Sequence, residues 1–104
     1  MMETPYRASR LFRVLANPLA YQVISLLRGG PSRPCALAAQ LKRPPSSIAR
    51  VARELKMTDL IRFVSIRTGG LGRGRAVEYR LKDETVETLM ATAEQFIQQV
   101  RVQT

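Results

Sequence analysis

The sequence has 104 residues, of which 45% are hydrophobic, a composition typical of one small folded domain with a thin core. Lysine and arginine number 17 against 8 acidic residues, and the net charge of +9 favours a polyanionic partner such as nucleic acid over charge that only keeps the protein soluble. The single cysteine excludes an intramolecular disulfide framework, and the absence of histidine leaves acid–base and thiol catalysis without their usual partners, so we expect no enzyme.

No apolar run is typical of a signal peptide, and none is long enough to span a bilayer. We therefore expect a protein of the reducing cytoplasm with no membrane partner. Charge is unevenly distributed, because almost all basic residues precede Asp83, whereas the segment after Lys82 holds one arginine against four carboxylates. The basic surface should therefore belong to the middle of the fold.

The first predicted helix spans residues 6–15, where apolar residues recur at helical spacing between three arginines. Asn17 and Pro18 are typical of a helix start, and the second helix should run to about Arg28, where two glycines and a proline end it. These two helices form the first half of the predicted core.

Pro34 is expected to open a third, short helix that ends before Pro44. A fourth helix should begin at once with Pro45 and run through about Met57. Its apolar residues recur at helical spacing along one face: Ile48, Val51, Ala52 and Leu55. The sequence therefore predicts two helices joined by a tight turn.

Residues 60–66 and 76–81 are rich in β-branched and aromatic side chains, and four glycines lie in residues 68–74 between them. This pattern predicts a β-hairpin with a long tip, in which Tyr79 is a strand packing residue rather than a base-stacking one. A last helix follows from Asp83. The predicted fold class is mainly α with a β-hairpin, in the order α-α-α-α-β-β-α.

The sequences LAAQL at residues 37–41 and SSIARVAREL at residues 46–55, followed by Leu60 and Ile61, resemble the helix-turn-helix of the ArsR/SmtB transcriptional regulators. Residues 12–18 and 73–81 are similar to the entry into that family's second helix and to its wing. The resemblance implies a single winged helix-turn-helix domain over residues 1–104. It also implies a homodimer that binds double-stranded DNA and regulates transcription, usually as an effector-coupled repressor.

Under this resemblance, residues 45–57 are the recognition helix, and the side chains expected to face DNA are Ser46, Ser47, Ala49, Arg50 and Arg53. Arg50 and Arg53 are three residues apart and share a helical face, where a guanidinium can bond guanine or clamp phosphate. The alternative is two solvated charges, with Arg53 neutralised by Glu54 or Glu78. The prolines at 44 and 45 depart from the polar cap that is usual in the family.

Arg73 and Arg75 lie in or beside the glycine-rich tip, which suits the placement of a guanidinium in a narrow minor groove. A disordered, solvated loop is the alternative. Both interpretations hold in turn if the loop is mobile in the free protein and becomes ordered when it meets DNA, and we favour the DNA contact.

The last helix carries an apolar stripe, which closes either an intramolecular core or a contact between subunits. In the ArsR/SmtB family the first and last helices form the dimer, and we favour that reading because four other elements already enclose the small core. The predicted dimer interface consists of Leu11, Val14, Leu15, Leu89, Met90, Ala93, Phe96, Ile97 and Val100.

Metal sensing, for which the family is known, is not expected. The residues that match its Cys-X-Cys element are Arg33, Pro34 and Cys35, and its other site needs histidine, which this sequence lacks. We predict no metal and no cofactor, and we expect Cys35 to be a small packing residue. The acidic residues Asp83, Glu84 and Glu87 are expected to stabilise the start of the last helix.

Two rivals remain for the basic winged helix. One is a module that binds an acidic protein partner, and the other is an architectural protein that binds nucleic acid without sequence preference. The operator, the regulated genes and the effector are not encoded in any recognisable pattern.

Overall fold

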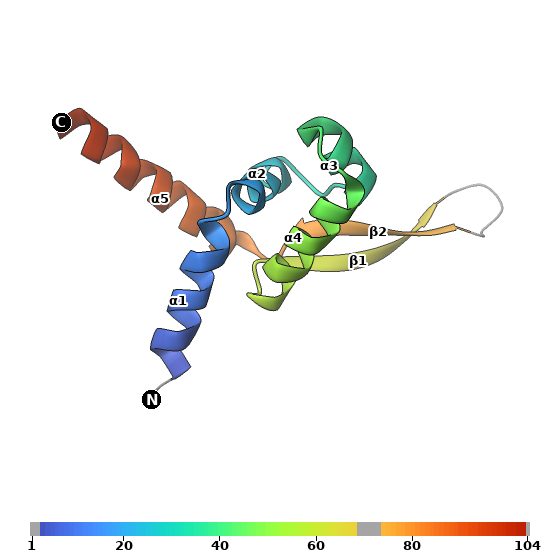
Figure 1. The fold of residues 1–104 in the computed structure, drawn as a ribbon, viewed down its shortest axis with the longest axis horizontal. Coiled ribbons are helices and arrows are strands. Elements are labelled where there is room, and N and C mark those ends of the chain that lie inside the picture. Colours follow the sequence, from blue (N-terminus) through green and yellow to red (C-terminus); the bar gives the residue numbers. More distant parts are fainter. Residues whose placement is uncertain (1–2, 69–73, 104) are drawn as a thin grey trace.

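The computed structural model describes residues 3–68 and 74–103, which form five helices and one antiparallel hairpin (Figure 1). The elements are α1 (Glu3–Leu15), α2 (Pro18–Leu27), α3 (Pro34–Leu41), α4 (Pro45–Met57), β1 (Ile61–Thr68), β2 (Gly74–Leu81) and α5 (Glu84–Gln103). This order confirms the predicted fold class. The largest difference is that α1 begins at Glu3 rather than at Tyr6.

Local sequence accounts for the boundaries of the central helices. The Asn17 side chain accepts hydrogen bonds from the N–H groups of Leu19 at 2.9 Å and Ala20 at 3.4 Å, so it caps α2. Helix α3 ends at Lys42, which adopts the left-handed conformation with φ 54°. Pro45 occupies the first turn of α4, where its missing N–H costs no helical hydrogen bond.

Strands β1 and β2 pair from Ile61 opposite Leu81 out to Thr68 opposite Gly74. The loop before α3 adds a further pairing, because the Ser32 N–H donates to the Tyr79 carbonyl at 3.1 Å and the Tyr79 N–H donates to the Ser32 carbonyl at 2.8 Å. This bridge joins the base of β2 to the chain that leads into the helix-turn-helix.

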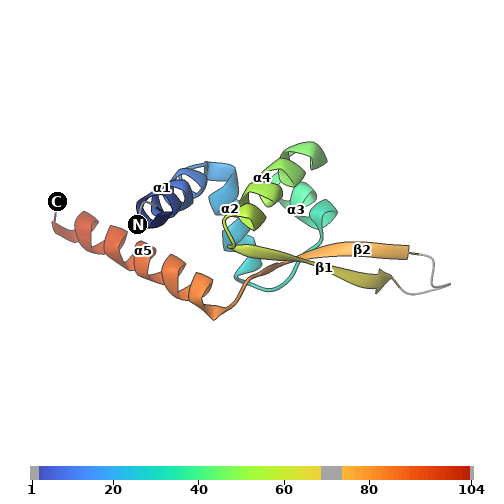
Figure 2. The ribbon, with the colours of Figure 1, turned by 90° about the horizontal axis from the view of Figure 1, so that it is seen from below.

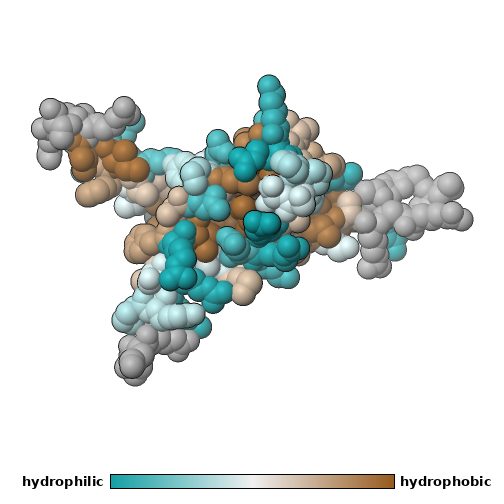
Figure 3. All heavy atoms as spheres, in the orientation of Figure 1, coloured by the Kyte–Doolittle hydropathy of each residue, from teal (hydrophilic) through white to brown (hydrophobic). Residues whose placement is uncertain are grey.

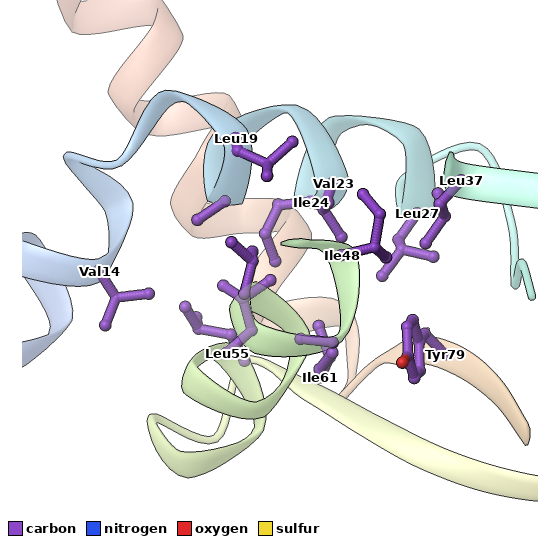
Figure 4. Packing of buried hydrophobic residues seen from close by; sticks show 14 of the residues in the cluster. Val14, Leu19, Val23, Ile24, Leu27, Leu37, Ile48, Leu55, Ile61 and Tyr79 are labelled. Carbon is purple, nitrogen blue, oxygen red and sulfur yellow. The ribbon is translucent and has the colours of Figure 1, made fainter. Parts of the chain in front are cut away.

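The hydrophobic core lies between α2, α3, α4 and the base of the hairpin (Figure 4). The predicted inward face of α4 is confirmed, since Ile48, Ala52 and Leu55 are each completely buried. Tyr79 packs into the same core from β2, as expected. The core therefore fixes α4 against the hairpin.

Helices α1 and α5 extend from the body at the end away from the hairpin, and their free ends diverge (Figures 1 and 2). Val14 joins α1 to the core, and Val86 and Met90 join α5 to it. Val14 is 8% exposed and Met90 is 1% exposed. Both are therefore core residues within one chain, which removes them from the predicted dimer interface.

None of the helices in the described ranges combines the length and the apolar character needed to cross a bilayer. Cys35 also differs from expectation, because it is exposed on α3. Leu37 and Ala38, which follow it, turn inward and leave Cys35 on the outer side of the first helical turn. The predicted packing role of Cys35 is therefore wrong.

Candidate DNA interface

Helix α4 separates its apolar and polar residues onto opposite faces. The apolar residues are buried, whereas Ser46, Arg50 and Arg53 are exposed on the outer side. Ser47 and Ala49 are half-buried at the border between the faces. The helix therefore presents a short polar ridge with two arginines one turn apart.

Both arginines of this ridge are available to a ligand. Within residues 3–68 and 74–103, no hydrogen bond or ion pair joins Arg50 or Arg53 to a carboxylate. Glu78, which we considered as a partner for Arg53, instead accepts from Arg80 Nε at 3.1 Å and Nη2 at 2.9 Å. The positive charge on α4 is thus not neutralised by Glu78.

The turn before α4 adds two cations that the sequence analysis did not assign. Lys42 and Arg43 are exposed, and the Arg43 N–H donates to the Ala38 carbonyl at 3.1 Å, which closes the turn. Their position immediately before the predicted recognition helix was a usable signal. They place positive charge beside the start of α4, where DNA backbone lies in helix-turn-helix complexes.

The hairpin continues the basic surface. Arg75 lies in β2 directly opposite Arg67 of β1, and Arg67 is exposed. Arg73, the other predicted wing residue, lies outside the described residues. Arg67 was missed because sequence alone does not give the pairing register that places it opposite Arg75.

A stack of side chains ties this wing to α4. The rings of Phe63 and Tyr79 are 4.7 Å apart, and the Lys56 ammonium lies 4.6 Å from the Phe63 ring centroid. Burial of Tyr79 raises the pKa of its phenol above the ordinary value, and the charge on Arg53 opposes this shift. The stack connects the end of α4 to both strands.

Helices α1 and α5 expose large apolar side chains. Phe96 is 65% exposed, Ile97 is 53% exposed and Val100 is 45% exposed, and hydrophobic atoms gather along this part of α5 (Figure 3). On α1, Tyr6 and Phe12 are each 65% exposed. We did not assign these two aromatic residues to the interface, although Phe12 belongs to the apolar pattern of the first helix.

The remaining predicted interface residues differ in exposure. Leu11, Leu15 and Leu89 are partly buried against the core, and Ala93 is exposed. An apolar surface of this kind, made by helix ends that extend from the body, is typical of subunit contacts. We refer to the exposed set on the two helices as the α1/α5 surface: Tyr6, Phe12, Ala93, Phe96, Ile97 and Val100.

A polar cluster, which we call the α2–α5 clamp, joins the base of α5 to α2. Arg28 donates from Nε and Nη2 to the two carboxylate oxygens of Glu87 at 2.8 and 2.7 Å, and from Nη1 to Glu94 at 2.8 Å. The Tyr21 hydroxyl donates to the other oxygen of Glu94 at 2.6 Å. These hydrogen bonds lower the pKa values of both glutamates and raise that of Arg28.

The clamp corrects part of our reading of the acidic residues. Glu87 faces Arg28 instead of serving mainly the start of α5. That start is capped by Asp83, whose carboxylate accepts the Thr85 N–H at 2.9 Å and also the Thr85 hydroxyl. The pairs 21/28 and 87/94 share a seven-residue spacing, but this spacing does not indicate that the two pairs face each other.

In the described parts of the chain, no group of three or more potential metal-ligating side chains is brought together. Cys35 is a single exposed thiol on α3. Zinc and related ions need several ligands at one site, and these residues do not assemble such a set.

No protein-family model matches the sequence, and no curated protein matches it. Solved structures do match. A homodimeric winged helix-turn-helix DNA-binding domain from Mycobacterium bovis, a possible ArsR-family transcriptional regulator, is 23% identical with a TM-score of 0.74 over 88% of this chain and 79% of its own. Rv0081 from Mycobacterium tuberculosis is 18% identical with a TM-score of 0.79 over 97% and 96%.

The transcriptional regulator HlyU from Vibrio vulnificus is 20% identical, with a TM-score of 0.66 over 92% of this chain and 93% of its own. Similarity at this level of identity shows the fold alone. The chain therefore has the winged helix-turn-helix fold of the ArsR-type transcriptional regulators.

Proposed function

We propose that this protein is a sequence-specific, double-stranded DNA-binding transcriptional regulator that acts as a homodimer in the cytoplasm and has no enzymatic activity. The observation that carries the proposal is the outer face of α4. Arg50 and Arg53 are exposed there without carboxylate partners among the described residues, while the opposite face is locked in the core. A rigid helix with free guanidinium groups is suited to reading bases.

In this proposal α4 enters the major groove. Arg50 bonds the O6 and N7 atoms of a guanine, and Arg53 contacts a base or a neighbouring phosphate. Ser46, Ser47 and Ala49 complete the contact face near the start of the helix. Direct base contacts supply the preference for one sequence, because phosphate contacts are the same on every duplex.

Phosphate contacts come from the residues around α4. Lys42 and Arg43 lie before the helix, and Arg67 and Arg75 lie on the hairpin strands. We place Arg73 with them, in the minor groove beside the half-site. These contacts position the protein and make binding dependent on salt concentration.

Dimerisation through the α1/α5 surface would bring two copies of α4 to successive major grooves, about 34 Å apart on a pseudo-palindromic operator. The exposed aromatic and aliphatic side chains support this arrangement, and the similar Mycobacterium bovis domain is homodimeric. Occupation of the operator would block transcription, so repression is the expected outcome.

Selection of bound duplexes from a random library tests the proposal. A regulator should enrich a two-fold related motif and bind it at least about 10³-fold more tightly than random duplex at the same salt concentration. An architectural protein would show similar affinities for the motif and for random duplex. A protein-interaction module would bind neither duplex, and affinity that does not change with salt would exclude phosphate contacts.

A further inference from the structure

Helix α5 has an anchored half and a half that projects from the body. Val86 and Met90 are buried in the core, and Glu87 and Glu94 face α2 through the clamp. Phe96, Ile97 and Val100 are exposed. Glu94 therefore still attaches α5 to α2 through Tyr21 and Arg28, and the C-terminal end of the helix projects away from the body (Figure 1).

The clamp has the geometry of a two-point attachment. Tyr21 lies on α2 and Arg28, seven residues later, is the C-cap residue of that helix, and Glu87 and Glu94 are two turns apart on α5. Arg28 contacts both glutamates, whereas Tyr21 contacts only Glu94, so the two helices run in opposite directions where they meet. Two points of attachment on each helix determine the angle between α2 and α5, whereas a single point of attachment would leave that angle undetermined.

Arginine is well suited to hold that angle. Its planar fork gives Glu87 two parallel hydrogen bonds, at 2.8 and 2.7 Å, and a third donor reaches Glu94. A bidentate pair of this kind restricts orientation as well as distance. The Arg28 side chain is only 21% exposed, so it is more shielded from solvent than a typical surface ion pair.

The other side of α2 belongs to the DNA-reading unit, which we define as α2, α3, α4 and the hairpin. Helix α2 packs against α4 through the core residues Val23, Ile24 and Leu27. A change in the angle between α5 and α2 therefore also changes the angle between α5 and the recognition helix. The apolar core transmits this change in angle from α2 to α4, because a closely packed core deforms little.

We propose that Arg28 is a positioning residue that, through Glu87 and Glu94, sets the angle of α5 to the DNA-reading unit and thereby the half-site spacing that the dimer accepts. The inference rests on the proposed function. In a dimer held by the α1/α5 surface, the projecting half of α5 is the arm that connects one recognition helix to the other.

The angle of α5 must be set precisely if the dimer is to distinguish half-site spacings that differ by one base pair. One base pair of added spacing moves a half-site by about 3.4 Å and rotates it about the duplex by roughly 34–36°. The nine residues after Glu94 within α5 form an arm about 13 Å long at 1.5 Å per residue. A modest change in the angle of this arm is enough to favour a neighbouring spacing.

The experiment measures affinity for duplexes that carry two half-sites separated by spacers of different length, and for a duplex with one half-site. The half-site duplex reports one recognition helix and does not depend on the angle between subunits. Arg28→Met removes the fork and keeps an extended side chain. Tyr21→Phe removes only one hydroxyl and gives a second variant if Arg28→Met folds poorly.

Arg80→Met is the matched control. Arg80 bonds Glu78 at 2.9 Å within a single strand. Arg80→Met therefore changes the net charge as much as Arg28→Met does, but it breaks no contact between two helices. Its spacing profile should match that of the wild type. Sedimentation analysis is used to check that each variant has the same oligomeric state as the wild type.

We expect Arg28→Met to retain half-site affinity within about twofold and to lose at least about tenfold on the best-spaced duplex, with the preferred spacing shifted or broadened. Tyr21→Phe should change the profile in the same direction to a smaller extent. An unchanged spacing profile in both variants, or a parallel loss on half-site and full-site duplexes, would overturn the inference. If the wild type shows no preferred spacing, the proposed function itself fails.

Discussion

The Lys56 ammonium near the end of α4 lies 4.6 Å from the ring centroid of Phe63 near the start of β1. This contact closes a stack that continues into the core, since the Phe63 ring is 4.7 Å from that of Tyr79. Tyr79 is in turn bridged by its backbone to Ser32. Helix α4 and the hairpin are therefore held together by side chains as well as by the short turn between them.

Replacing Phe63 with leucine should lower the free energy of unfolding by about 1–2 kcal/mol, because the aromatic pair and the cation–π contact are lost while apolar bulk is kept. Urea denaturation measures the change. In a double-mutant cycle with Lys56→Met, we expect a coupling energy of about 0.5–1 kcal/mol. A coupling near zero would show that the Lys56 contact does not contribute to stability.

Replacing Arg50 with alanine should weaken operator binding by about 1–3 kcal/mol and relax the preference at one base pair, because a bidentate contact to guanine is lost. Titration against operator and random duplexes measures both effects. Arg50→Lys is the control, since it keeps the charge but not the fork and should retain affinity for random duplex. Equal losses on the two duplexes in Arg50→Ala would contradict base reading.

Phe96→Asp should produce monomers and reduce affinity for a two-half-site operator, because it introduces a charge into the apolar contact proposed for α5. Analytical ultracentrifugation at micromolar concentration measures the mass. Gln95→Asp places the same charge on the neighbouring exposed residue and tests whether the effect is specific to the Phe96 position. A wild-type protein that sediments as a monomer would defeat the dimer proposal.

The clamp predicts that the stability of the folded protein depends on pH in the acidic range. Hydrogen bonds from Arg28 and Tyr21 lower the pKa values of Glu87 and Glu94 below 4.5 in the folded state. Their contribution is therefore complete above the unfolded value near 4.5 and is lost as the pH falls through the lower folded values. Denaturation midpoints measured between pH 7 and pH 3 should fall less steeply in Arg28→Met than in the wild type; identical slopes would contradict this linkage.

Micromolar zinc or arsenite should leave operator affinity unchanged within about twofold, and Cys35→Ser should bind as the wild type does. Cys35 is exposed on α3, and the described residues provide no cluster of further ligands around it. Fluorescence anisotropy with and without metal measures the effect. Metal-induced release that disappears in Cys35→Ser would indicate ligands contributed by a second subunit.

The sequence by itself determined the order of elements and the buried face of α4. Helical periodicity and the prolines at 34, 44 and 45 define α3 and α4, because proline restricts where a helix begins and ends. Likewise, the spacing of Ile48, Ala52 and Leu55 fixes which face of α4 is buried and leaves Arg50 on the other face. These features depend on interactions within a few residues of the chain.

Only the tertiary structure decided which apolar residues of the terminal helices are left for a partner. Met90 shares the periodic pattern of α5 with Phe96, and Val14 belongs to the apolar pattern of α1, yet Met90 and Val14 are buried because they lie where α5 and α1 meet the body. Phe96 belongs to the same stripe but lies beyond the point at which α5 leaves the core. Periodicity identifies a face of a helix, whereas burial depends on how far along the helix the neighbouring elements extend.

The same reason explains the clamp and the exposure of Cys35. The contact between Arg28 and Glu87 joins residues 59 positions apart, and a charge on a helix surface carries no local signal of its partner. Cys35 is a residue type that is commonly buried, but the packing of Leu37 and Ala38 turned it outward. Long-range pairing and the direction of a helix face relative to the body are set by the assembled core.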